Sequence, residues 1–136
     1  MAEDRAFKLR IISPDRLFYE GDVIMVEVRT TEGEIGVLKH HIPLTAVLAP
    51  GVARIKESET EIKIAALHGG FIEILQDSMT ILAEIVEWPE EIDLHRAQEA
   101  RVRAERRLSE KATGTNMARA SLALQKSITR IEAAKK

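Results

Sequence analysis

The feature that most constrains this chain is a change of pattern within residues 87–103. Before it, apolar and polar residues alternate and glycines are frequent; after it, the chain is rich in Ala, Glu, Arg and Leu, with no proline and one glycine. Pro89 lies at the boundary, where a helix tolerates proline because its first backbone N–H groups have no partner within the helix. Acidic residues follow, which favours a helix N-terminus. We therefore predict a β domain at residues 1–88 and a two-helix arm at residues 89–136.

The β domain is predicted to be an antiparallel sandwich or barrel. About nine short alternating segments, of which residues 23–29 are the clearest, recur roughly every ten residues and are separated by turn residues. A parallel βαβ sheet would need helical patterns between the strands, and the sequence has none. In residues 60–67 the side chains predicted to face inward are Ile62, Ile64 and Ala66.

The arm is predicted to be a helical hairpin, because the apolar period becomes helical over residues 90–112 and again over roughly 116–133. The first helix carries a stripe of mostly small residues at Ala97, Ala100, Ala104, Leu108 and Ala112. The second carries Met117, Ala120, Leu124, Ile128 and Ile131 on one face. Gly114 is a candidate C-cap, and Thr115 or Asn116 a candidate N-cap. Alanine buries little apolar area and isolated helices of this length are marginal, so we expect an arm stable mainly when docked.

The charge distribution is uneven. Residues 1–89 contain 9 Lys and Arg against 15 Asp and Glu, which gives −6, whereas residues 90–136 contain 11 against 7, which gives +4. A basic arm can fold back on its acidic domain or bind an acidic partner or a phosphate; a solvated helix surface is the alternative. The absence of cysteine excludes disulfides and thiolate chemistry. We see no signal peptide and no apolar run long enough to span a membrane.

No constellation of nucleophile, base and orienting group is evident, so we expect a protein that is not an enzyme. The four histidines lack metal-ligand spacing and are expected in loops and caps. Asp93 and Arg96 are one helical turn apart, which is consistent either with a helix cap and intrahelical ion pairs or with a nucleotide site. In the second case carboxylates would accept from the base or ribose and cations would bind phosphates. The other candidate members are Glu87, Arg103, Lys126 and Arg130.

Four motifs, in order and at matching spacings over nearly the whole chain, resemble the epsilon subunit of bacterial F-type ATP synthase. They are Gly-Glu-Ile-Gly-Val-Leu at 33–38, His-Ile-Pro-Leu at 41–44, Gly-Gly-Phe-Ile-Glu at 69–73 and Ile-Asp-Leu-His-Arg-Ala at 92–97. One departure is Lys39-His40, where that family commonly has Pro-Gly.

The resemblance implies a sandwich of about ten strands followed by the helical hairpin. It implies a non-catalytic rotor subunit whose sandwich binds the gamma subunit and the membrane c-ring during proton-driven ATP synthesis, with Glu34 facing the c-ring loops. The helices would fold down on the sandwich or extend into the alpha/beta catalytic head and inhibit ATP hydrolysis. The protein would lie at the cytoplasmic face of the bacterial cell membrane, held there only through the complex, with no nucleic-acid partner.

The resemblance also implies ATP as a regulatory ligand, because family members that bind it carry the motif (Ile/Leu)-Asp-x-x-Arg-Ala. That motif is matched by Ile92, Asp93, Arg96 and Ala97, and its accompanying positions correspond to Glu87, Arg103, Lys126 and Arg130. Lysine at 126, where arginine is usual, keeps the charge but loses the planar fork, so weaker phosphate contact is expected. Participation of Mg²⁺ stays open. A structural adaptor without nucleotide binding is the main alternative; a nucleic-acid-binding hairpin is disfavoured, because acids interleave with bases on its first helix.

Overall fold

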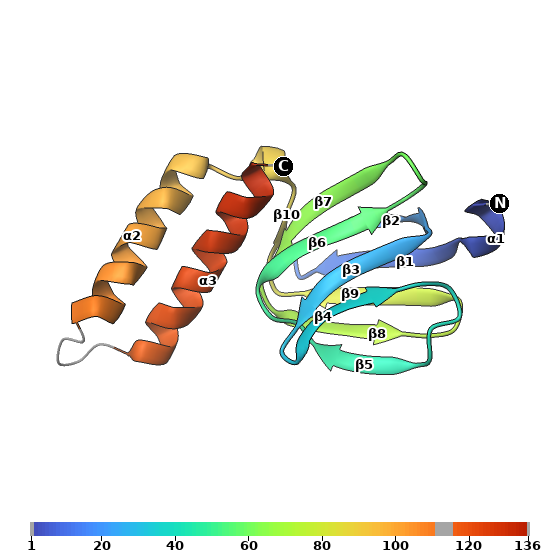
Figure 1. Ribbon diagram of the computed structural model, residues 1–136, viewed down its shortest axis with the longest axis horizontal. Helices are drawn as coiled ribbons and strands as arrows, with labels where there is room; N and C mark the ends of the chain where they lie inside the picture. The colour runs from blue at the N-terminus through green and yellow to red at the C-terminus, as the bar shows by residue number, and fades with distance from the viewer. Residues whose placement is uncertain (1, 111–115, 136) are drawn as a thin grey trace.

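The computed structural model describes residues 2–110 and 116–135, and in these it contains ten strands followed by two long helices (Figure 1). A short helix, α1 (Ala2–Arg5), precedes the strands. The strands are β1 (Phe7–Ser13), β2 (Arg16–Val23), β3 (Met25–Thr30), β4 (Gly33–Val37), β5 (Leu44–Val47), β6 (Gly51–Lys56), β7 (Ile62–Leu67), β8 (Gly70–Ile74), β9 (Ser78–Ala83) and β10 (Val86–Glu87). The predicted β-sandwich with a C-terminal two-helix hairpin is confirmed.

The strands form two five-stranded sheets that pack face to face. Sheet A has the order β2-β1-β9-β8-β5 and sheet B the order β10-β7-β6-β3-β4. Every pairing is antiparallel except that of β1 with β9, which is parallel. The first strand thus lies inside sheet A, between β2 and β9.

The core lies between the sheets and follows the alternation seen in the sequence. In β1 the side chains of Phe7, Leu9 and Ile11 are buried, whereas Lys8 and Arg10 are exposed. This pattern is expected for a strand with one face on the core and one in water. The same holds for β3, where Val26 and Val28 are buried.

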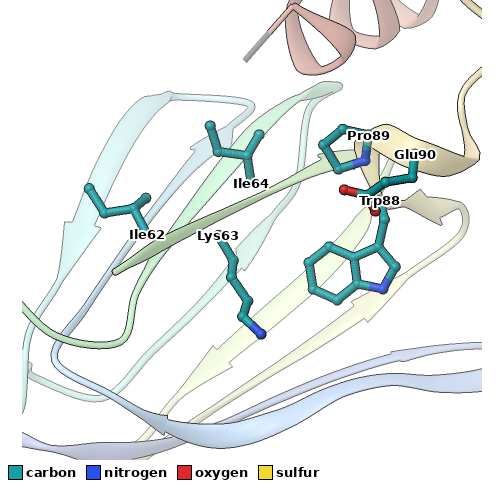
Figure 2. A pocket seen from close by; sticks show the side chains of 6 residues that line it. All are labelled: Ile62, Lys63, Ile64, Trp88, Pro89 and Glu90. Carbon is teal, nitrogen blue, oxygen red and sulfur yellow. The ribbon is translucent and has the colours of Figure 1, made fainter. Parts of the chain in front are cut away.

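The face predicted for β7 is wrong. Ala65 and Leu67 of this strand belong to the core, whereas Ile62 is 45% exposed and lies on the opposite face. Figure 2 shows Ile62 and Ile64 on one side of the strand and Lys63 on the other. Ala66 is buried, but outside the core cluster between the sheets. The alternation predicted the wrong inward face because part of the outer face of β7 is also apolar and is covered by the arm.

The first long helix begins later than residue 90, where the helical period predicts its start. Residues Pro89–Glu91 form a separate 3₁₀ turn, η1, and the first long helix, α2, spans Leu94–Glu110. The second, α3, spans Met117–Ala134, and Asn116 caps it by accepting from the backbone N–H of Arg119 at 3.0 Å, as predicted. The expected break at Gly114 and the stripe residue Ala112 lie outside the described residues.

The two helices pack against each other, and α3 lies between α2 and the sandwich (Figure 1). Ala97 and Ala104 are buried, as the alanine stripe predicts. On α3, Ala120 and Ile131 are buried, but Met117 and Ile128 are exposed, contrary to the predicted apolar face. Helix α3 contacts β6 and β7, so sheet B carries the arm on its outer face.

Candidate functional site

The arm meets the sandwich at Glu87, the last residue of β10. Its Oε1 accepts a hydrogen bond from Nε of Arg130, on α3, at 2.8 Å. The same oxygen lies 3.0 Å from Nε2 of His68, at the end of β7. The Glu87 side chain is 23% exposed and that of Arg130 30%, whereas His68 has no exposed surface. A carboxylate at this junction therefore links the interior of the sandwich to the arm.

Glu87 is ionised at neutral pH despite its partial burial. Burial alone would raise the pKa of this carboxyl group, but the hydrogen bonds from His68 and Arg130 and the nearby positive charge lower it to about 2. Hydrogen bonding to the charged form is one of the standard ways in which a protein lowers a carboxyl pKa. The site therefore presents a stable negative charge to α3.

The η1 turn next to Glu87 is fixed to the sandwich. Glu91 accepts from the backbone N–H of Trp88 at 2.8 Å and from both terminal nitrogens of Arg16 at 2.9 and 2.8 Å. The Arg16 hydrogen bonds lower the pKa of Glu91. The Trp88 ring stacks on Phe18 with the ring centroids 4.1 Å apart.

Beside this turn lies an open groove of about 430 Å³ (Figure 2). Its lining comes from β7 and from the start of η1: Ile62, Lys63, Ile64, Trp88, Pro89 and Glu90. Two residues, Ile92 and Asp93, connect this attached turn to the start of α2.

Asp93 caps α2. Its Oδ1 accepts from the backbone N–H of Arg96 at 3.1 Å, and its backbone carbonyl accepts from the N–H of Ala97 at 3.0 Å. This is the capping role that the spacing of Asp93 and Arg96 allowed as an alternative to ligand binding. The cap leaves the exposed carboxylate at the positive end of the helix dipole.

The remaining predicted residues are cations that are not joined into the cluster. Arg96 and Arg103 are exposed on α2, and Lys126 is half-buried on α3, one turn before Arg130. In residues 2–110 and 116–135 no hydrogen bond or ion pair joins the side chain of any of these three to Glu87 or Asp93, although the backbone N–H of Arg96 donates to Asp93. Arg103 instead lines a shallow groove on α2. Ala97, the remaining motif residue on α2, is buried.

His68 was missed as a member of this site by the sequence pattern. The run Ala65-Ala66-Leu67 before it indicates a buried strand end. Its partner Glu87 is 19 residues away, and nothing in the spacing of the two residues pairs them. His68 does lie in the loop between β7 and β8, as expected, but its burial and its contact with Glu87 were not predicted.

Two domain descriptions of one family match the sequence. Residues 6–89 match the ATP synthase delta/epsilon chain β-sandwich domain, and residues 90–135 match the long α-helix domain of the same chains. The chain belongs to the ATP synthase delta/epsilon family. Curated relatives that match the chain are ATP synthase epsilon chains, and the three described next match over at least 93% of this chain.

The ATP synthase epsilon chain of Caldanaerobacter subterraneus is 45% identical over 134 residues, which is 98% of this chain and 96% of the relative. That of Halalkalibacterium halodurans is 44% identical over 127 residues, 93% of this chain and 95% of the relative. That of Bacillus velezensis is 41% identical over 130 residues, 96% of this chain and 98% of the relative.

Solved structures share the fold. A chain in the mitochondrial ATP synthase of Euglena gracilis, solved as OSCP, F1 and c-ring, superposes with a TM-score of 0.81 at 24% identity, covering 94% of this chain and 80% of that one. A chain in the central stalk and c-ring of the Tetrahymena thermophila enzyme superposes with a TM-score of 0.55 at 12% identity, covering 94% and 92%. None of the helices in residues 2–110 and 116–135 has the length and apolar character of a membrane span.

The outer face of sheet A carries an apolar row of the kind that a subunit of an assembly exposes. Paired positions in all five strands contribute to this row: Leu17, Ile12, Leu82, Phe71 and Val47. All but Ile12 are exposed, by 39% to 57%. A row of apolar side chains of which four in five are exposed is typical of an interaction surface.

Glu34, the predicted contact with the c-ring, lies in β4 beside a tight turn. Thr30 shapes this turn by donating to the carbonyl of Gly33, whose φ is 124°. The Glu34 carboxylate is 3.7 Å from Arg29 and mostly exposed. It also lines a cleft of about 260 Å³ between sheet B and α3, which contains Gln125 and Glu132 of the arm.

Proposed function

We propose that this chain is a non-catalytic rotor subunit of an F-type ATP synthase. Its sandwich would join the gamma subunit to the c-ring, and its arm would restrain ATP hydrolysis by the alpha/beta head when extended. Family membership and full-length similarity to epsilon chains support the assignment. The apolar row on sheet A supports docking on a protein partner, and the exposed Glu34 fits contact with polar loops. In this assignment the protein lies at the cytoplasmic face of the bacterial membrane, held through the complex.

The observation that carries the regulatory part is the way the arm is attached. Helix α2 packs on α3, and α3 alone of the two packs extensively on the sandwich. In the described residues, Glu87–Arg130 is the one side-chain ion pair between α3 and the sandwich. The cleft beside Gln125 and Glu132 shows that packing elsewhere along this contact is incomplete. The free energy needed to detach such an arm from the sandwich is low, which allows an equilibrium between a docked and an extended arm.

Nucleotide would bias that equilibrium toward the docked posture. The donor set fits a nucleoside triphosphate, because Glu87 and Asp93 offer acceptors while Arg96, Arg103, Lys126 and Arg130 offer positive charge. A ligand specific to one posture stabilises it by roughly 2.7 kcal/mol at a hundred times its dissociation constant. That magnitude exceeds what one partly exposed ion pair contributes, so ATP would decide the posture.

Calorimetric titration of the full chain with ATP tests this proposal. The test variant is Asp93→Asn, Arg96→Gln, which retains a residue able to cap α2 and leaves the net charge unchanged. The matched control is Arg101→Gln, Glu105→Gln, which removes a 3.6 Å ion pair from the same helix with the same charge balance. We expect binding in the wild type and the control and a loss of at least tenfold in the test variant. Equal heats in all three proteins would rule out the site.

A structural adaptor that does not bind nucleotide is the second candidate. It is favoured by the fact that Asp93 already caps a helix and Glu87 already has two partners. It predicts no ATP heat in any of the three proteins, together with loss of rotor assembly when the apolar row of sheet A is made polar.

A further inference from the structure

His68 has a fully buried side chain, which makes a single polar contact within the part of the chain that the structure describes. It follows β7, and its backbone N–H donates to the carbonyl of Ile85 at 2.9 Å, which fixes the position of its Cα. Its Nε2 lies 3.0 Å from Oε1 of Glu87. Its Nδ1 is buried and has no hydrogen-bond partner among the described residues.

This arrangement assigns the direction of the hydrogen bond. The ionised carboxylate of Glu87 can only accept, so the hydrogen between the two groups is on Nε2 of His68. Buried polar atoms are normally paired, and leaving Nδ1 without a partner costs stability. An apolar side chain would fill the same volume without that cost. The contact with Glu87 is therefore the one feature of His68 that packing does not explain.

The same carboxylate oxygen accepts from Arg130. The single N–H that His68 donates is enough to orient Glu87, and the carboxylate oxygen still accepts a second hydrogen bond, from Arg130. When α3 departs, Glu87 loses Arg130 but retains His68, because both His68 and Glu87 belong to the sandwich. The acceptor would then keep its orientation in both postures of the arm.

We propose that His68 is a positioning residue that holds the Glu87 carboxylate toward α3, ready for Arg130 of the returning arm. The second part of the inference rests on the proposed function: the same orientation serves the nucleotide that Glu87 is proposed to contact. Without His68, the Glu87 side chain regains rotamer freedom that must be lost again on each docking event. For a glutamate that entropy corresponds to about a tenfold change in the docking equilibrium.

The test uses the full chain labelled with a fluorophore pair at Thr60→Cys and Ser109→Cys, two exposed sites, one on the sandwich and one on α2. The natural sequence has no cysteine, so labelling is confined to these sites. Energy transfer reports the docked fraction without nucleotide. Calorimetry gives the ATP dissociation constant of the same proteins, and thermal unfolding reports the integrity of the sandwich.

His68→Met fills the volume without a donor, and His68→Gln restores an amide donor. We expect Met to lower the docking constant about tenfold and to weaken ATP binding by a similar factor, with an unchanged or higher unfolding midpoint, and Gln to recover most of both. If His68 only fills space, Met will dock as well as the wild type, and that result would overturn the proposal.

A second cycle keeps the inference testable if a variant is unstable. Because His68 is proposed to act through Glu87 and Arg130, His68→Gln and His68→Met should dock equally in an Arg130→Met background. A difference that persists there would contradict the proposal. If ATP binds no variant, including the wild type, while docking still falls in His68→Met, the nucleotide site fails and the positioning role stands.

Discussion

The Glu87–Arg130 ion pair makes a quantitative prediction about the arm. Arg130→Met removes the guanidinium but keeps an unbranched side chain at this position. Hydrogen bonds to charged groups contribute about 1.5–3 kcal/mol, whereas fully exposed ion pairs contribute about 0–1 kcal/mol. This pair has a 2.8 Å contact and partners that are 30% and 23% exposed, so it falls between the two classes. We expect a loss of about 1.5 kcal/mol, or about tenfold in the docking constant.

Energy transfer between labels at Thr60→Cys and Ser109→Cys measures that constant. Arg119→Met is the matched control, because Arg119 is an exposed arginine on the same helix and the change in charge is identical. We expect the control to dock like the wild type, within twofold. If both variants dock equally well, the ion pair does not hold the arm, and the reasoning that assigns the posture to this junction is wrong.

Three further predictions follow from the same structure. Because the pKa of Glu87 is lowered from 4.5 to about 2, the contribution of its ionised form to the free energy of unfolding is complete above pH 4.5 and is lost as the pH falls toward 2. At 1.36 kcal/mol per pKa unit this contribution is at most about 3 kcal/mol. Urea unfolding at pH 6 and pH 2.5 should therefore show a smaller loss of stability in Glu87→Gln than in the wild type. Asp93→Ala should cost about 1 kcal/mol in thermal unfolding of the arm, whereas Asp93→Ser should retain most of the cap. Phe71→Glu should leave the sandwich folded but weaken its complex with the gamma subunit at least tenfold in a pull-down titration, with exposed Glu73→Gln as the control.

Much of the sandwich could be predicted, because its strands have one face in the core and one in water. The alternation in β1 and β3 identifies the buried side chains correctly. It fails in β7, where Ala66 is covered from outside by the arm and the outer face is apolar as well. Periodicity reports burial, and it does not distinguish burial between the sheets from burial under a helix.

The start of the first long helix was predicted early, because a local pattern does not show long-range contacts. Pro89 and the acidic residues after it are typical of a helix start, but Glu91 is bound by Arg16 from a strand 75 residues earlier. This contact and the Trp88 stack hold the turn on the sandwich, so α2 begins only after Asp93 caps it. Long-range contacts of this kind leave no local pattern.

The candidate site was predictable as a set of residue types rather than as an arrangement. In the structure, Glu87 forms an ion pair with Arg130 of α3, and Asp93 accepts a hydrogen bond from the backbone of Arg96 at the start of α2. The structure adds His68 to this set, because the pairing of β7 with β10 brings His68 next to Glu87. Arg103 and Lys126 stay predicted contributors whose role depends on the ligand.

The central claim is that nucleotide decides the posture of the arm, and energy transfer between the sandwich and α2 during an ATP titration tests it most directly. The account predicts that ATP raises the docked fraction along a saturable curve whose midpoint matches the calorimetric dissociation constant, and that Asp93→Asn, Arg96→Gln abolishes the response. A docked fraction that stays constant while calorimetry shows ATP bound would contradict the account.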